Sequence, residues 1–207
     1  MDLRGRKEIL KCISENTGDP ISFARKKYDA ITAYQVTLRS RGLHFSEEIR
    51  YFYKAGFIKM EFIRPFPGII LIYNPVQKEV RLKPLKIAGR IMSLSPDNPL
   101  IRSSAGHRID ESDIGSLLKA IATLQSHGET FISGTQCISG QQVLQIRITG
   151  SGSFAFRGIH QYDLWLDNNT YLPIKAVSYY PNGDLIEELF LDDLITDPEL
   201  PDELFCL

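Results

Sequence analysis

Apolar and polar residues alternate over two long stretches of the chain. From Tyr34 to Leu82, and again from Phe131 to Leu191, apolar side chains recur at every second position between turn-forming residues. A period of two is typical of β-strands that bury one face, and short strands with polar turns predict antiparallel meanders. The run GIILIYNP (68–75) is apolar in both phases, so we expect this strand to be central and covered on both sides.

Helical spacing appears in three places. Apolar residues within 6–15 predict a short first helix, and Asp19-Pro20 supplies an N-cap and a first residue for a second one. Asp110, with Asp113 three residues on, is expected to cap a third helix that ends at Gly128. Helices on one face of an antiparallel sheet make an α+β fold. We expect one domain over 1–207, with 1–18 as a helical extension.

The hairpin YDLWLDNNTYLPIKAVSYYPNG (162–183) raises the question of what covers the apolar face. Its first strand sends Tyr162, Leu164 and Leu166 to one side and Trp165 to the other, between Asp163 and Asp167. Trp165 is interpreted either as packing or as a contact surface for a partner. The apolar phase of the predicted strands comprises Tyr34, Val36, Leu38, Ile49, Tyr51, Tyr53, Ile58, Met60, Phe62, Val80, Leu82, Leu144, Ile146, Leu164 and Leu166.

Charge excludes one class of function. The net charge of -1 argues against a dedicated nucleic-acid binder, which needs a basic excess to neutralise phosphates. The charges are unevenly spread, however: 25–90 hold fourteen Lys or Arg against five acids, and 176–207 hold nine acids and no basic residue. Either these segments attract each other across the fold, or a basic rim meets an acidic partner or anionic headgroups.

The cysteines and the start of the chain leave the compartment open. The three cysteines, Cys12, Cys137 and Cys206, are far apart and show no metal-binding or redox spacing. No run approaches the roughly 18 apolar residues of a membrane span. The start has no apolar stretch typical of a secretory leader, so the protein is either cytoplasmic or has lost its leader.

The segment GHRIDESDIG (106–115) is the most enzyme-like part of the chain. His107, Asp110, Glu111 and Asp113 are residue types that bind metals or transfer protons. Capping of a helix already explains the acids, and the other histidines show no matching spacing. We therefore expect a loop and a helix start without a metal or a cofactor, and no catalytic site.

Three stretches carry a resemblance to a known family. They are KAGFIKMEFIRPFPGIILIYNPVQKEV (54–80), YDLWLDNNTYLPIKAVSYYPNGDLIEELFLDDL (162–194) and ITDPELPDELF (195–205). Together they resemble the LolA/LolB-like superfamily of periplasmic lipoprotein carriers and outer-membrane lipoprotein-sorting proteins, over most of 20–205. The segment 93–115 resembles a subgroup of this superfamily more than the carrier itself.

The resemblance implies a half-open antiparallel β-barrel, which is one strongly curved sheet with helices across its concave face. In that family the concave face is a hydrophobic cavity for acyl chains, and the fifteen apolar-phase residues would line it. The implied function is a non-enzymatic protein of the periplasm or cell envelope that binds a lipid, an acyl chain or a lipoprotein. The alternative is a protein-interaction or assembly module whose cavity is filled by its own side chains.

Overall fold

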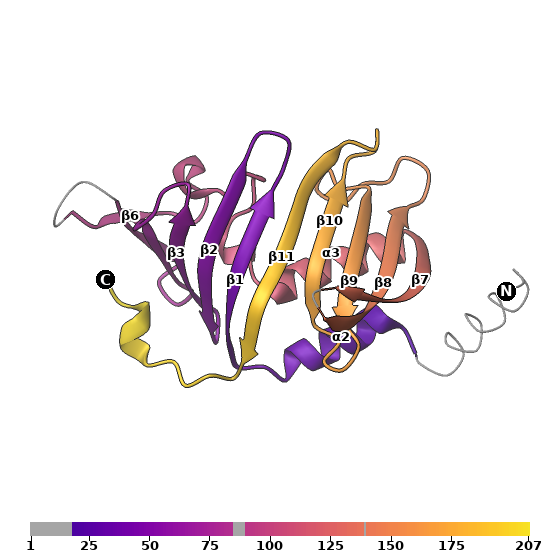
Figure 1. Ribbon diagram of the computed structural model, residues 1–207. Helices are drawn as coiled ribbons and strands as arrows, with labels where there is room; N and C mark the ends of the chain where they lie inside the picture. The colour runs from indigo at the N-terminus through magenta and orange to yellow at the C-terminus, as the bar shows by residue number, and fades with distance from the viewer. Residues whose placement is uncertain (1–17, 85–89, 139) are drawn as a thin grey trace, which may run out of the picture. The chain divides into compact units, whose positions relative to one another are not determined.

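The structure is a computed structural model that describes residues 18–84, 90–138 and 140–207 (Figure 1). The helix expected within 6–15 lies outside these residues, as does Cys12. The described residues form two α-helices, α2 (Pro20–Asp29) and α3 (Ile114–Ser126), and eleven strands. The strands are β1 (Ala33–Arg41), β2 (Ser46–Lys54), β3 (Phe57–Arg64), β4 (Ile70–Asn74), β5 (Glu79–Lys83), β6 (Met92–Leu94), β7 (Gly128–Ile138), β8 (Gln141–Gly150), β9 (Gln161–Asp167), β10 (Pro173–Tyr179) and β11 (Leu185–Thr196). Three short 3-10 helices are η1 (Pro99–Ile101), η2 (Ile109–Glu111) and η3 (Asp202–Phe205).

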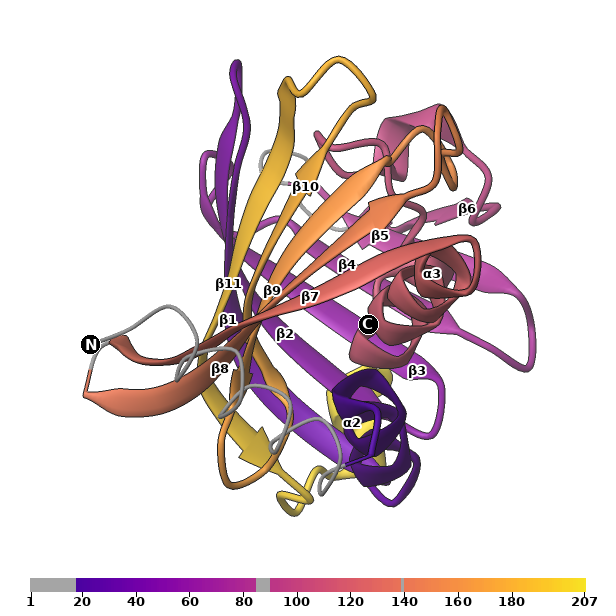
Figure 2. The ribbon, with the colours of Figure 1, turned by 90° about the vertical axis from the view of Figure 1, so that its right-hand side faces the viewer.

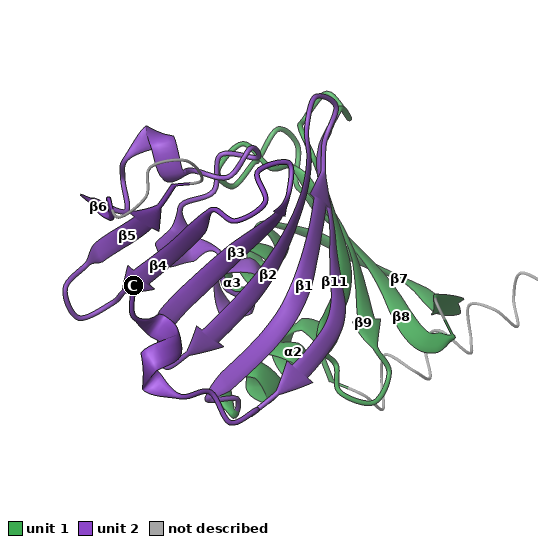
Figure 3. Ribbon diagram, turned by 60° about the vertical axis from the view of Figure 1, so that its left-hand side comes forward, with its two compact units in different colours: residues 1–30, 118–184 green, residues 31–117, 185–207 purple. Residues whose placement is uncertain are grey.

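The chain divides into two compact units, coloured green and purple in Figure 3. Unit 1 comprises 1–30 and 118–184, and its strands lie in the order β10-β9-β8-β7. Unit 2 comprises 31–117 and 185–207, with the order β6-β5-β4-β3-β2-β1-β11. Strand pairs within each unit are antiparallel. The α+β class and the antiparallel sheet expected from the sequence are confirmed, and the single domain stays a prediction.

Helix α2 begins where the sequence indicated. The Asp19 carboxylate accepts hydrogen bonds from the backbone N–H groups of Ile21 (3.2 Å) and Ser22 (3.0 Å), and Pro20 is the first helical residue. These contacts satisfy two of the N–H groups that a helix start leaves unpaired, and proline has no N–H to satisfy. The expected cap is confirmed.

Helix α3 begins three residues later than Asp110 would have placed it. Asp113 is the capping residue: its carboxylate accepts from the backbone N–H of Ser116 (3.1 Å) and from the Ser116 hydroxyl (2.6 Å). Asp110 lies instead in η2 and binds the Arg108 guanidinium through both oxygens, at 2.9 and 2.7 Å. The prediction of Asp110 as the cap is wrong, because an arginine two residues away engages that carboxylate and the 3-10 turn intervenes.

The outer face of the β1–β11 pair in unit 2 is held by ion pairs between the basic and acidic segments. The register sets Arg39 opposite Phe190 and Arg41 opposite Glu188. Arg39 pairs with Asp192 and Arg41 with Glu188, while Lys54 of β2 binds Asp202 of η3 at 2.6 Å. Attraction of the two charged segments across the fold, the first of the two interpretations, accounts for these residues.

Strand β4 is covered on both sides, as expected for a central strand. Leu71 and Tyr73 point to one face and Ile72 to the other, and all three are buried. On the Ile72 side the C-terminal η3 contacts both β3 and β4, with the Phe205 ring 6.1 Å from the Phe57 ring. The chain's own C-terminal segment therefore supplies the second cover.

Candidate functional site

The apolar face of unit 2 is the candidate site, and strand register assembles it. Eleven of the fifteen predicted lining residues belong to this unit, and cross-strand pairing places them in three rows on one face. The rows are Leu38–Ile49–Phe62, Val36–Tyr51–Met60–Leu71–Leu82 and Tyr34–Tyr53–Ile58–Tyr73–Val80. Residues at directly paired positions have their side chains on the same side of a sheet. Their common face follows from the register, whereas a role in ligand binding stays a prediction.

Two residues of this face were missed by the sequence pattern. Leu71 and Tyr73 complete the second and third rows, and both are buried. They belong to the run that is apolar in both phases, so alternation offered no signal for the direction of their side chains. The pairing of Met60 with Leu71 and of Ile58 with Tyr73 settles it. On β11, Leu191 opposite Leu38 extends the same face.

The exposure of the side chains differs between the rows. In the row of Tyr34 all but Tyr53 are buried, whereas in the row of Ile49 both Leu38 and Phe62 remain partly exposed. Of all fifteen predicted residues ten are buried, and the partly exposed ones are Leu38, Tyr53, Phe62, Leu82 and Leu144. The row of Leu38 and Phe62 is therefore where the face of unit 2 is most accessible.

This face is closed at Tyr34 and Tyr51 by the segment 112–114, which includes the first residue of α3. The Tyr34 hydroxyl accepts a hydrogen bond from the backbone N–H of Ile114 (3.1 Å), and the Tyr51 hydroxyl lies 3.2 Å from the Ser112 hydroxyl. The Tyr34 ring stacks on Tyr51 and on Tyr53, with centroids 5.9 and 5.0 Å apart. Burial raises the pKa of Tyr51 far above its ordinary value, so this hydroxyl stays neutral. These buried polar groups are all satisfied, which fixes the segment on the sheet.

A polar cluster lies at one end of the same face. Glu187 of β11 is 9% exposed and its carboxylate accepts from the hydroxyl of Ser40, which is also buried. The Nε2 atom of His107 lies 2.9 Å from the other Glu187 oxygen, and Ser104 from the same loop donates to Glu47. The loop 103–107 is thus tied to this end of the sheet by two carboxylates.

The order of this cluster does not suit nucleophilic catalysis. In a serine hydrolase the imidazole lies between the serine and the carboxylate, because it must accept the hydroxyl proton. Here Glu187 lies in the middle, and it separates Ser40 from His107. His107 was expected to stay near Asp110, Glu111 and Asp113 in a loop, yet its carboxylate partner lies eighty residues along the chain.

The acids of 110–113 have other partners, as described above for Asp110 and Asp113. Among the described residues, no group of three His, Cys, Asp or Glu side chains is arranged so that it could hold a metal ion. Nor does any helix in the described part of the chain have the length and apolar character to cross a membrane.

In unit 1 the four remaining predicted residues also share a face. Leu144 pairs with Leu166, and Ile146 pairs with Leu164. Ile148 and Tyr162 continue this face and are buried. The alternation assigned both residues to this phase, although neither was included in the predicted lining.

A second cluster of side chains is buried on the opposite face of unit 1. Trp165 is 9% exposed and packs with Val143 and Val177, and Ile138 near the β7–β8 turn lies against this cluster. The Lys175 ammonium lies 4.7 Å from the centre of the Trp165 ring. Of the two interpretations of Trp165, packing within the protein accounts for its burial.

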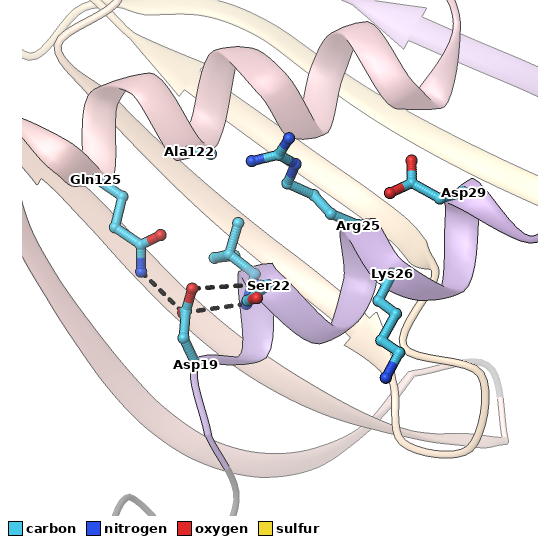
Figure 4. Close-up of a pocket in the computed structure, with 8 residues that line it drawn as sticks. Asp19, Ser22, Arg25, Lys26, Asp29, Ala122 and Gln125 are labelled. Atoms are coloured by element: carbon cyan, nitrogen blue, oxygen red, sulfur yellow. Dashed lines mark hydrogen bonds between the residues drawn. The ribbon is translucent and has the colours of Figure 1, made fainter.

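A pocket of about 410 Å³ lies between α2 and α3 in unit 1 (Figure 4). Arg25 points into the space between the helices, and the Gln125 amide donates to Asp19 at 2.9 Å. The lining residues are Asp19, Ile21, Ser22, Arg25, Lys26, Asp29, Ala122 and Gln125. Six of these eight are polar or charged, so this pocket does not suit an acyl chain.

No protein-family model and no curated protein matches this chain. Among solved structures, an uncharacterised conserved protein from Thermus thermophilus is similar over 90% of each chain, at 12% identity and a TM-score of 0.55. A chain of the Pseudomonas aeruginosa MucA/MucB complex is similar at 13% identity and a TM-score of 0.53, over 91% of this chain but 60% of that one. The Mycobacterium tuberculosis lipoprotein LppX is similar at 12% identity and a TM-score of 0.52, over 88% of this chain and 96% of LppX.

These likenesses establish the fold alone, because the identities are low. A LolA superfamily protein from Nitrosomonas europaea is also matched, at a TM-score of 0.37 that adds no weight. The fold is therefore shared with the lipoprotein LppX and with a chain of the MucA/MucB complex.

Proposed function

We propose that this protein is a non-enzymatic protein of the cell envelope that binds a lipid, an acyl chain or a lipidated protein on the apolar face of its sheet. The observation that supports this proposal is that Leu38 and Phe62 are apolar and partly exposed, on either side of the buried Ile49, at the edge of a mostly buried face. Partly exposed apolar surface that continues a buried face is a typical entry point for an apolar ligand.

The fold supports the proposal. LppX, which shares it, is a lipoprotein, and the sequence-level resemblance is to carriers of lipidated cargo. The fifteen predicted lining residues are proposed as ligand-binding residues, eleven on the apolar face of unit 2 and four on the apolar face of unit 1. The place of Glu187 between Ser40 and His107 supports a binding role rather than a hydrolytic one.

A second function is favoured by a different observation. Ten of the fifteen predicted residues are buried, and Tyr34 and Tyr51 are hydrogen-bonded to the segment 112–114. A face filled in this way suits an interaction or assembly module whose partner binds elsewhere. One matched structure is a complex of two proteins, MucA and MucB.

Binding of a fluorescent fatty-acid probe, measured together with urea unfolding, separates the two functions. The informative variant is Phe62→Ala, and the matched control is Phe52→Ala, since Phe52 lies in the opposite phase of the neighbouring strand and is also partly exposed. On a face open to ligand, Phe62→Ala weakens probe binding and costs less than the roughly 3–5 kcal/mol typical of a filled core. Phe52→Ala leaves binding unchanged.

The opposite result removes the lipid-binding function. If the wild-type protein binds no probe, its organic extract holds no lipid, and Phe62→Ala loses the full core value of stability, the face is closed. The interaction module is then the function that remains.

A further inference from the structure

Strand β7 of unit 1 has a free edge. Among the described strands it is hydrogen-bonded to β8 alone, and it forms one end of the strand order (Figure 2, where β7 lies toward the viewer). It is eleven residues long, and every one of them is exposed or partly exposed. Such an edge presents a row of unpaired backbone N–H and C=O groups, which can pair with another strand.

The residues of β7 do little to protect this edge. The sequence GETFISGTQCI contains one charge, Glu129, and neither lysine nor proline, the residues with which proteins commonly block exposed edges. The strand is rich in residues that favour extended structure, and Phe131 is 60% exposed. The one interruption is a register shift between Ile132 and Gly134.

The backbone direction along the edge follows from the ladder with β8. Ser151 donates its N–H to the carbonyl of His127 (2.9 Å), so His127 directs this group toward the β8 side. In an antiparallel ladder the direction alternates with each residue. Glu129 and Phe131 therefore bond β8, and Thr130 and Ile132 direct their N–H and C=O groups to the free edge.

Only outward-directed residues can exchange hydrogen bonds with a new strand, and this fixes a register. With Thr130 opposite Ile132 of a second copy, the twofold axis passes through Phe131, and the reciprocal pair forms by symmetry. The two Phe131 rings then occupy a non-hydrogen-bonded pair, in which Cα atoms approach to about 4.5 Å and side chains make their closest contact. Glu129 lies opposite Ser133 of the second copy, the residue at the register shift that ends the regular pairing, so like charges do not meet.

The neighbouring registers are poorer. An axis at Thr130 sets Glu129 opposite the Phe131 ring of the second copy, and an axis at Ile132 sets Thr130 opposite Gly134, beyond the register shift. We propose that the β7 edge is a self-association surface, on which two copies of this chain pair their β7 strands antiparallel about an axis at Phe131. The occupant is a second copy because this register pairs the edge with itself and buries the exposed phenyl group.

Disulfide trapping tests the register directly. Cys12, Cys137 and Cys206 are first replaced by serine, and Phe131→Cys is introduced into the full chain, since a non-hydrogen-bonded pair has the Cα separation that a disulfide needs. The proposal expects a covalent dimer on mild oxidation. Glu129→Cys alone should remain monomeric, whereas a mixture of Glu129→Cys and Ser133→Cys chains should cross-link, because the axis sets these positions opposite each other.

Sedimentation equilibrium of the unmodified chain gives the second readout. Phe131→Lys should weaken dimerisation at least about tenfold, because it replaces an aromatic pair by two like charges. Thr135→Lys is the matched control, since it lies beyond the paired segment and should leave the dissociation constant unchanged. Melting temperatures of all variants check that each chain is folded.

Either of two results overturns the proposal. One is a wild-type chain that sediments as a monomer at every concentration. A monomeric chain that binds some other extended peptide at this edge also contradicts the proposal. The other is that Glu129→Cys cross-links by itself while the mixture of Glu129→Cys and Ser133→Cys chains does not. This comparison does not need Phe131→Cys, so it still decides the matter if that variant fails to fold.

Discussion

The outward-facing side chains of two strand regions, β1–β11 in unit 2 and β9 in unit 1, follow the same alternating pattern but differ in exposure to water. On β1 and β11 of unit 2 the outward phase carries Arg39 and Asp192, whose side chains are 49% and 35% exposed. On β9 of unit 1 the outward phase carries Trp165, which is buried, and Asp163, which is 4% exposed. One face is a solvated ladder of ion pairs and the other is a second small core.

The difference lies in what covers each face. In unit 1 Ile138, near the turn that joins β7 and β8, packs against Val143, Trp165 and Val177. The burial leaves the Trp165 indole N–H without a hydrogen-bond partner among the described residues. An unsatisfied donor costs about 1–3 kcal/mol, and burial of a large aromatic ring offsets that cost. A polar neighbour in the sequence is therefore a poor guide to whether the outward phase of a strand meets water.

The largest expected effect is at Trp165. Trp165→Ala should lower the free energy of urea unfolding by about 3–5 kcal/mol, because it empties the second core. The matched control is Trp165→Phe, which keeps most of the ring and removes the unpaired N–H, and it should cost less than about 1.5 kcal/mol. A small loss for the alanine variant would show that Trp165 contributes little to the fold and would return it to the role of a partner contact.

Removal of either partner of the Arg147–Asp163 ion pair in unit 1 should lower the free energy of unfolding by different amounts. Arg147 binds both oxygens of Asp163 at 2.6 and 2.8 Å, but its own side chain is 50% exposed whereas that of Asp163 is 6% exposed. Arg147→Ala leaves a buried carboxylate that has lost its charged partner and should cost about 2–3 kcal/mol in urea unfolding. Asp163→Asn leaves an arginine that reaches water and should cost about 1 kcal/mol. Equal losses would contradict the burial difference.

The smallest effect is expected in the ladder of unit 2. A double-mutant cycle of Arg39→Ala and Asp192→Ala should give a coupling free energy of about 0.2–1 kcal/mol, as exposed ion pairs do. The coupling should shrink in roughly 1 M salt, where screening is effective over a few ångströms. The Arg147–Asp163 pair provides the comparison and should be less sensitive to salt. A salt-insensitive coupling would contradict a solvent-exposed ion pair, because the contact of Arg39 with the Phe190 ring, 4.9 Å away, cancels in the cycle.

Local chemistry made much of the fold predictable. The capping of α2 by Asp19 needs only the side chain and the two backbone N–H groups that follow it, so the sequence was sufficient. The strands of both meanders were likewise predictable, because period-two alternation is a property of neighbouring residues. The third helix shows where local reasoning stops: both Asp110 and Asp113 suit a cap, and the nearby arginine decides between them.

The candidate site was predictable only in part, because its composition depends on register. Alternation assigned Tyr34, Ile49 and Phe62 to one phase, yet it gave no phase for Leu71 or Tyr73 in a run that is apolar throughout. Hydrogen bonding between β3 and β4 decided those two. The partnership of His107 with Glu187 lay beyond any spacing argument, since the two residues are eighty positions apart.

The sequence by itself determined the class of fold, the start of α2, the strands and the phase of most apolar residues, since all of these follow from contacts within a few positions. Only the tertiary structure decided that Trp165 is buried, that Glu187 separates Ser40 from His107, and that β7 ends the order of the described strands. The physical reason is the same in each case. Burial and partnership are properties of segments that meet in space, and strand pairing joins segments whose distance along the chain the pattern does not encode.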